Sequence, residues 1–468
     1  MTKLSWKIHN HVRIALYNQE QLPPSATVKF EGGIFVEALI GFLMIVVIVA
    51  LLLLGKMSPI VVLAVIPALA ALPLGYDPIT IAGFIKDGIG TTTSNGILFI
   101  FSVIYFGVLS DTGLFDVIVN WLVKRAGNNV IAVTVATAIV ATIAHLDGTT
   151  ATTVLITIPS LYPVYKRMNI DGRILLCLTG ACMGVMNLLP WGGPTARAAT
   201  VLGMDANDLW HMLIPIQITG FVMNIVLAVF MGMLALKMGA GAGKGEEVAA
   251  DTKEAADAQA LRKSTPFLIF NLILTIGVIA VLSLGLATSY VVFLMGLCIL
   301  LAVNYPDQKL QDKLVKKHAP AALIISATLF AAGAMVGIFD GTGMLTAMAQ
   351  AIMNVIPHAL GRYIHVIFGL LALPLGLCIG TDAYFYGIMP LVMEVGETYG
   401  VASLSTALTM VIGKNIALMV SPLVPATYLA IGLTNTELRD HMKFSIPPYY
   451  VISVIMLIFG IILQIIPL

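Results

Sequence analysis

Residues 130–166, VIAVTVATAIVATIAHLDGTTATTVLITIPSLYPVYK, are apolar except in the middle, where Asp147-Gly148-Thr149-Thr150 interrupts them. Residues 364–393 are interrupted in the same way by Gly380-Thr381-Asp382. Backbone that is not helical is tolerated at membrane depth only where protein or a water-filled cavity surrounds it. We therefore expect each stretch to form a re-entrant hairpin, whose two short helices meet at a polar tip and return to the side they entered from.

The composition is that of a chain that lies mostly in lipid. Of the 468 residues, 59% are hydrophobic and 10% are charged, against roughly a quarter charged in soluble domains. A soluble enzyme is thereby excluded, and the expected fold class is an all-α polytopic membrane protein. The formal net charge of +1 gives no reason to expect a nucleic-acid partner. Ten further stretches are long enough to span a bilayer: 35–54, 58–75, 96–110, 172–202, 210–237, 265–285, 289–304, 320–338, 402–431 and 447–467.

Glycine, proline and polar interruptions repeat along the chain at a nearly constant spacing. Thr112-Gly113 matches Thr342-Gly343 at 230 residues, the hairpin tips match at 232, and Pro194 matches Pro425 at 231. Each half has five spans and one hairpin, and an odd number of spans turns the second half upside down, as in the inverted repeats of secondary transporters. We expect a polar tail (1–34), a first repeat (35–237), a cytoplasmic linker (238–264) and a second repeat (265–468).

Basic residues gather in the loops on one side of this topology. Lys124, Arg125 and the linker lysines lie on that side, whereas Lys86 and Arg362 alone fall in loops on the other side. Because positively charged short loops stay in the cytoplasm, we expect the first span to start outside and the protein to lie in the cell (inner) membrane.

A second pair of interruptions lies inside the spans 172–202 and 402–431. The strings NLLPWGGPTAR (187–197) and NIALMVSPLVPAT (415–427) each place two prolines within five residues. Such prolines free carbonyls that the helix cannot pair. The break either kinks the span or forms a substrate site, and its presence in both halves favours a site.

Ionisable side chains in these elements need a reason, because a charge at mid-membrane costs roughly 2.5–3.5 kcal/mol on insertion scales. At the hairpin tips, Asp147 and Asp382 can accept a proton, coordinate a cation or cap the following half-helix. The planar guanidinium of Arg197 is suited to donate two hydrogen bonds to a carboxylate, unless it pairs with a neighbouring acid or reaches an interface. Lys414 is equally a site residue or a lysine that extends to an interface. His145 is expected to be packed or hydrogen-bonded.

Four strings in these elements resemble those of the citrate-metal:proton symporter (CitMHS) family: DGTTATTVLITIP (147–159), NLLPWGGPTARAAT (187–200), TDAYFYG (381–387) and VSPLVPAT (420–427). The family belongs to an ion-transporter superfamily that also contains the sodium-coupled dicarboxylate carriers. The resemblance implies a secondary transporter, and no enzyme, that imports citrate complexed with a divalent metal of the Mg or Ca type, in symport with protons. It also implies a homodimer with an elevator mechanism, in which a substrate domain moves against a scaffold, and no permanently bound cofactor.

The resemblance further implies the site residues, since hairpin tips bind carboxylates in related carriers. Asp147 and Asp382 are the implied proton-coupling groups and would also face the metal of the substrate. Free citrate carries about three negative charges at neutral pH, and a bound divalent ion brings the complex near one, which suits a core with few fixed cations. The alternatives are a sodium-coupled di- or tricarboxylate carrier without metal and, more remotely, an intramembrane protease with the two aspartates as a dyad. The implied substrate-binding residues are Gly148, Thr149, Thr150, Gly193, Thr195, Arg197, Gly380, Thr381, Ser421 and Thr427.

Overall fold

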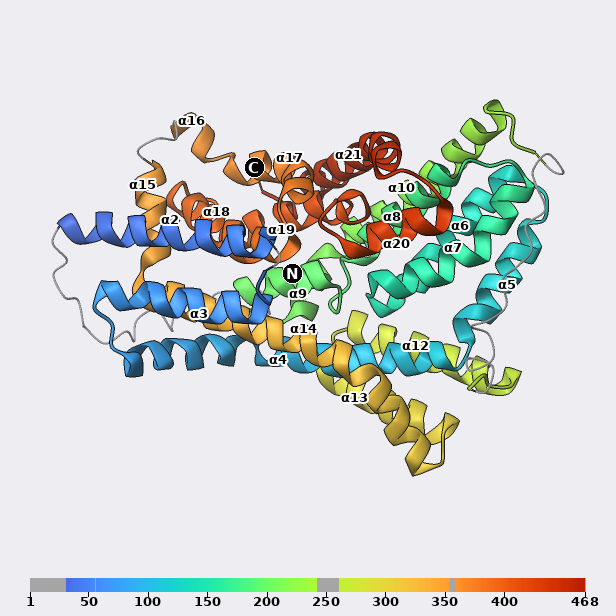
Figure 1. The fold of residues 1–468 in the computed structure, drawn as a ribbon, viewed down its shortest axis with the longest axis horizontal. Coiled ribbons are helices and arrows are strands. Elements are labelled where there is room, and N and C mark those ends of the chain that lie inside the picture. The colour runs from blue at the N-terminus through green and yellow to red at the C-terminus, as the bar shows by residue number, and fades with distance from the viewer. Residues whose placement is uncertain (1–30, 55, 242–260, 354–357, 468) are drawn as a thin grey trace, which may run out of the picture.

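A computed structural model describes residues 31–54, 56–241, 261–353 and 358–467. The described part is built from helices and their connections, without a strand (Figure 1). The prediction of an all-α protein is confirmed. Residues 1–30 of the expected tail and 242–260 of the expected linker lie outside the described residues.

The first half of the chain contains two long helices, one hairpin and one broken helix. Its elements are α2 (Glu31–Leu54), α3 (Pro59–Ala71), η2 (Leu72–Leu74), α4 (Pro78–Asp111), α5 (Leu114–Ala126), α6 (Val130–Ala144), η3 (His145–Asp147), α7 (Thr150–Arg167), α8 (Gly172–Met186), α9 (Gly193–Val201) and α10 (Ala206–Lys237).

The second half follows a similar order. Its elements are α12 (Thr265–Ser283), α13 (Ser289–Asn304), α14 (Gln308–Thr342), α15 (Met344–Met353), α16 (His358–Gly361), α17 (Ile364–Cys378), the π-helix η4 (Ala383–Ile388), α18 (Met389–Thr398), α19 (Ser403–Asn415), η5 (Leu418–Val420), α20 (Pro425–Thr434) and α21 (Leu438–Ile462). That the two halves are inverted in the membrane stays a prediction.

By length and composition, seven stretches of the described helices could cross a membrane: 35–52, 78–111, 130–147, 206–237, 265–283, 308–342 and 438–462. Four shorter apolar helical stretches accompany them, at 59–74, 172–186, 289–304 and 364–378. A multi-pass membrane protein is thus confirmed, although the ten expected spans differ in detail. The spans 172–202 and 402–431 are interrupted, as their prolines predicted.

The two longest helices, α4 and α14, were predicted too short. They have 34 and 35 residues instead of the stretches 96–110 and 320–338, so each is about 50 Å long. Polar residues in their N-terminal halves hid this length from a search for apolar runs. Capping aspartates, Asp77 and Asp307, start both helices by accepting backbone N–H groups of the first turn. The helices cross in direct backbone contact, because a Cβ on Gly88 would overlap the carbonyl oxygen of Gly333.

The matched glycines explain two helices that the sequence analysis did not predict. Gly113 and Gly343 both have left-handed φ angles, of 81° and 70°, and each turns the chain from a long helix into a shorter one. The shorter helices, α5 and α15, are amphipathic, so they lack the continuous apolar run that marked the other helices.

Both predicted hairpins consist of two helices joined at the predicted break, but the two breaks differ. In the first, η3 ends at Gly148, whose φ of 70° reverses the chain before α7. In the second, Ile379 is extended and the chain enters the π-helix η4 after Asp382. Gly380, which matches Gly148 in the sequence, does not have a positive φ.

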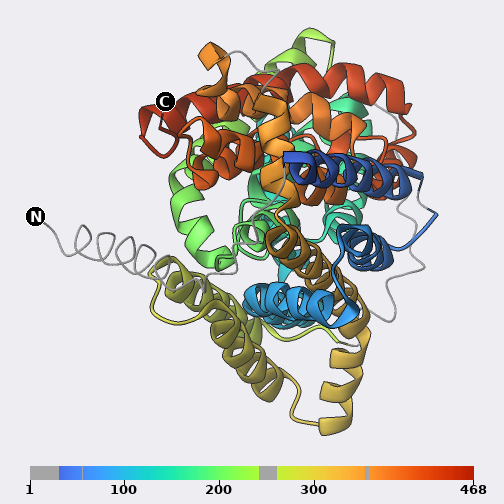
Figure 2. The ribbon, with the colours of Figure 1, turned by 90° about the vertical axis from the view of Figure 1, so that its left-hand side faces the viewer.

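Two sets of closely packed helices can be distinguished, and α9 contacts both. In one set, α4 packs against α14 and α13, and α14 also packs against α3. In the other, the hairpins surround the broken helices: α6 and α7 pack against α8, and α17 and α18 pack against α19. The short helix α9 contacts both α4 and α14 as well as α19 and η4, and lies near the middle of the molecule (Figure 1). In the view at 90°, α12 and α13 extend away from the other helices (Figure 2).

Candidate functional site

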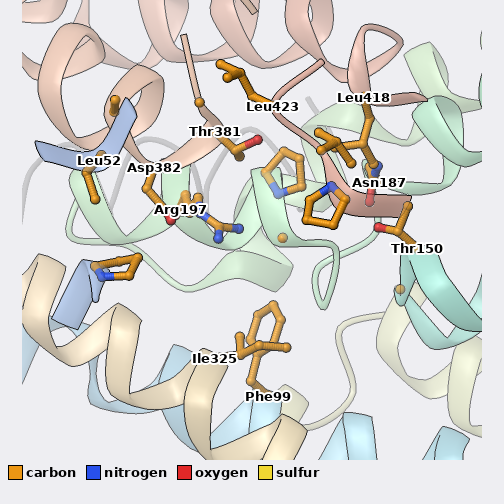
Figure 3. Close-up of a pocket in the computed structure, with 18 residues that line it drawn as sticks. Leu52, Phe99, Thr150, Asn187, Arg197, Ile325, Thr381, Asp382, Leu418 and Leu423 are labelled. Atoms are coloured by element: carbon orange, nitrogen blue, oxygen red, sulfur yellow. Dashed lines mark hydrogen bonds and ion pairs between the residues drawn. The ribbon is translucent and has the colours of Figure 1, made fainter. Parts of the chain in front are cut away.

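A cavity of about 500 Å³ lies where both hairpin tips and both broken helices meet (Figure 3). Phe99 of α4 and Ile325 of α14 close it on the side of the long helices. Its volume is within the range of small-molecule sites, roughly 300–1,000 Å³. The polar and glycine residues that line it are Gly148, Thr150, Asn187, Gly193, Arg197, Gly380, Thr381 and Asp382.

Three helices begin at this cavity. Thr150, Gly193 and Pro425, the first residues of α7, α9 and α20, all line it. A helix N-terminus presents unpaired N–H groups and about half a positive charge, and so favours an anion. The prolines and glycines that interrupt the apolar stretches therefore place three positive helix ends around one space.

The two halves are joined in the cavity by an ion pair. The Nε of Arg197, from α9, donates to Oδ1 of Asp382, at the second hairpin tip, over 2.7 Å. Their side chains are 20% and 22% exposed. Among the described residues that line the cavity, these two are the only base and the only acid. Arg197 thus pairs with an acid, which was one of the alternatives. The pair uses Nε, so the two terminal nitrogens of the guanidinium remain available to a ligand.

Lys414 does not line the cavity itself but is buried beside it, bonded to a residue that does. Its residue is 4% exposed, and its Nζ donates to the Thr381 hydroxyl at the second hairpin tip over 3.0 Å. Lys414 therefore does not extend to the membrane surface, which was the other alternative. The second half therefore supplies one acid and one base beside Arg197 of the first half.

Asp147 is turned into its own loop. Its Oδ1 accepts the backbone N–H of Thr149 over 2.8 Å, and its Oδ2 accepts the Thr149 hydroxyl. Neither residue lines the cavity. In this arrangement the carboxylate closes a turn in the loop that leads into α7, and both of these hydrogen bonds go to Thr149, which precedes the helix. Its coupling role stays a prediction.

Three of the expected binding hydroxyls are buried at the breaks of the broken helices, where they bond to backbone groups. Thr195 donates to the carbonyl oxygen of Asn187 over 3.0 Å. Thr427 donates to the carbonyl oxygen of Ser421 over 3.2 Å, and the Ser421 hydroxyl accepts the N–H of Leu423. In this structure the hydroxyls form hydrogen bonds with backbone groups at the two breaks. They do not line the cavity, whereas seven of the other predicted residues do: Gly148, Thr150, Gly193, Arg197, Gly380, Thr381 and Asp382.

Asn187 is a cavity residue that the sequence analysis did not single out. Its Oδ1 faces Nε2 of the buried His145 at 3.2 Å, and the second ring nitrogen of His145 contacts the Thr153 hydroxyl at 2.6 Å. The expectation that His145 is packed is confirmed. The buried Nδ2 of Asn187 has no hydrogen-bond partner within the described residues, so it can donate to a ligand. Its place at the start of the string 187–197 was the available signal.

Comparison with known proteins places this chain in a family. A sequence model for a family described as "Citrate transporter" matches residues 34–413. A protein named "Citrate transporter" from Bacillus subtilis (strain 168) is 32% identical over 87% of this chain and 94% of its own length. The "Mg(2+)/citrate complex secondary transporter" of the same organism is 34% identical over 87% of this chain and 94% of its own length.

This chain also resembles a solved structure, in its fold alone. The YdaH transporter of Alcanivorax borkumensis has a TM-score of 0.59 and 14% sequence identity, with 92% of this chain and all of that chain covered. The family and these relatives are transporters and not enzymes, as the resemblance implied. The chain belongs to the citrate transporter (CitMHS) family.

Proposed function

We propose that this protein imports citrate as its complex with a divalent metal of the Mg or Ca type, in symport with protons, across the cell inner membrane. The proposal includes an elevator movement of the hairpins and broken helices against the long helices, and a homodimer. The metal travels as part of the substrate, and no other cofactor is involved.

The charge of the site is the observation that carries the proposal. Asp147 is bonded within its own loop, so the charged groups that act on one another at the cavity are Arg197, Asp382 and, bonded to the lining residue Thr381, Lys414. With ordinary charges, Arg197 and Lys414 are positive and Asp382 is negative, which leaves a surplus of one positive charge. A buried charge that is not balanced is costly. Free citrate, with about three negative charges, would exceed this surplus, whereas the complex with a divalent cation would match it. The printed name of the 34% identical relative, a Mg(2+)/citrate complex transporter, supports the same substrate.

The geometry suggests how the substrate is held. The terminal nitrogens of Arg197 and the amide of Asn187 can donate to carboxylates, together with the hydroxyl of Thr150. The helix N-termini add partial positive charge. The Asp382 carboxylate is the lining group that could face the metal. The proton could be taken by Asp147 or Asp382, as the sequence predicted, or by Lys414.

Uptake of labelled citrate into proteoliposomes tests the proposal. We expect accumulation when Mg²⁺ is present and a pH gradient, acid outside, is imposed. A chelator should abolish uptake, and a protonophore should stop accumulation. Uptake that is equally fast with chelator would refute the requirement for a metal. Accumulation that persists after the proton gradient collapses would refute the coupling to protons. Dependence on sodium instead would identify the alternative, a sodium-coupled carrier without metal.

A further inference from the structure

Lys414 has an unusual environment for an ammonium group. It lies in the last turn of α19 with Thr381 as its hydrogen-bond acceptor, while the rings of Tyr384 and Phe385 lie 5.5 and 5.3 Å from Nζ. An ammonium has three donors, and Thr381 is the one acceptor recorded for it within the described residues. Gly376 of α17 packs against its aliphatic stem, where a Cβ would lie 3.0 Å from Cγ.

The charged groups that act on Lys414 are Arg197, from α9, and Asp382, from the second hairpin. Asp382 already holds Arg197 at 2.7 Å, so its charge is mostly compensated. The other titratable groups recorded in hydrogen bonds on helices packed against α19 are bonded elsewhere. His365, His441, Tyr384 and Tyr449 contact backbone carbonyls, and Glu394 and Glu397 accept from hydroxyls.

We propose that Lys414 carries the coupled proton: it is an ammonium while metal citrate is bound and a neutral amine when the empty site returns. This inference rests on the proposed function and assigns its proton to one nitrogen. The neutral amine takes a proton from the outer solution as the complex binds and so becomes the ammonium. It gives that proton to the inner solution after the complex leaves.

Charge balance supports this assignment. With Lys414 protonated, the one surplus positive charge cancels the one negative charge of metal citrate, so the loaded site is neutral. With Lys414 neutral, only the Arg197–Asp382 pair remains, so the empty site is neutral too. Both crossings then avoid moving a net charge through the low-dielectric membrane and against the membrane potential.

The two aspartates are less suited to this role in the observed arrangement. Protonation of Asp382 would leave the guanidinium of Arg197 beside a neutral carboxyl group, without a compensating negative charge. Protonation of Asp147 would weaken its hydrogen bonds to Thr149, which does not line the cavity, whereas Lys414 is bonded to Thr381, which does. Loss of the Lys414 proton instead removes a charge that has a single neutral partner.

Two substitutions of Lys414 test the inference in proteoliposomes. Lys414→Arg keeps a charge that cannot be released, so the loaded site stays neutral while the empty site is charged. We expect exchange of internal for external Mg-citrate within about threefold of wild type, but net proton-driven uptake lower by roughly tenfold or more. Lys414→Met removes the proton carrier and should lose concentrative uptake. Lys443→Arg and Lys443→Met, at an exposed lysine of α21, are the matched controls and should behave as wild type.

A binding measurement keeps the test independent of transport. In weakly buffered detergent solution, wild type should take up about one proton per Mg-citrate bound at a pH where Lys414 is neutral in the empty site, and Lys414→Arg should take up none. The inference would be overturned if either Lys414 variant accumulated Mg-citrate at the wild-type rate. It would also be overturned if Lys414→Arg took up as many protons on binding as wild type does. If wild type itself shows no proton-driven uptake, the proposed function fails instead, so the two failures are distinguishable.

Discussion

Replacing Arg197 by methionine separates the two roles that its side chain has in the cavity. One role is structural, because Nε holds the Asp382 carboxylate at 2.7 Å. The other is the proposed donation of the terminal nitrogens to a citrate carboxylate. Methionine fills similar space without charge. A double variant, Arg197→Met with Asp382→Asn, also removes the carboxylate that would be left unpaired.

The partial burial of the Arg197–Asp382 pair sets the size of the expected loss of stability. Exposed pairs contribute roughly 0–1 kcal/mol, and breaking a fully buried pair costs roughly 3–5 kcal/mol. Because the side chains are 20% and 22% exposed, we expect Arg197→Met to lower the free energy of unfolding by about 2 kcal/mol. The double variant should recover most of this loss. It should not recover transport, because a charge-assisted contact worth roughly 1.5–3 kcal/mol to the substrate is still absent.

Denaturation in detergent and initial uptake rates at low Mg-citrate concentration measure the two effects. Arg197→Lys is the control, since it keeps the charge beside Asp382 but lacks the planar fork. It should stay stable and transport at least several times more slowly. The reasoning is wrong if the double variant transports like wild type, or if Arg197→Met unfolds at the same denaturant concentration as wild type.

Three further predictions concern other parts of the site and its scaffold. Gly88→Ala should strongly reduce the yield of folded protein, because its Cβ would overlap the backbone of α14, whereas Gly90→Ala, with no atom within 4 Å of its Cβ, should not; size-exclusion chromatography of the two variants compares them. Asp147→Ala should cost about 1 kcal/mol of stability through the lost hydrogen bonds to Thr149, and Asp147→Asn less, because its amide oxygen can still accept one of them, as measured by denaturation; equal losses would contradict this structural role in the loop. Asn187→Asp keeps the acceptor for His145 but replaces the free amide with a negative charge, so KM for Mg-citrate should rise roughly tenfold or more; an unchanged KM would remove Asn187 from the binding site.

The interruptions of the chain were predictable from its sequence, whereas the contacts between distant segments were not. Two prolines within five residues, or an aspartate beside glycine and threonine, mark a break wherever the neighbouring residues are apolar. The pair between Arg197 and Asp382 joins residues 185 positions apart, and no local pattern encodes it. Lys414 shows the same limit, because its hydrogen bond to Thr381 depends on how α19 packs against the second hairpin.

Local similarity was also an incomplete guide to local conformation. Gly148 and Gly380 stand at matching positions, yet only Gly148 adopts a left-handed φ. The residues that follow differ, since Tyr384, Phe385 and Tyr386 are fully buried and continue as a π-helix in the second hairpin alone. The sequence therefore predicted where each hairpin breaks, but the burial of these rings decides how the second one does so.

The ion pair across the cavity also bears on how such a chain could have arisen by duplication. At the repeat spacing, Tyr428 corresponds to Arg197, Thr150 to Asp382 and Met183 to Lys414. Two separate copies of the first half would bring together two guanidiniums with no facing carboxylate, and two copies of the second half would lack the guanidinium. If the two halves are repeats, as the sequence spacing predicts, complementary charges at this cavity require that they have diverged, and their fusion in one polypeptide ensures that they meet in a one-to-one ratio.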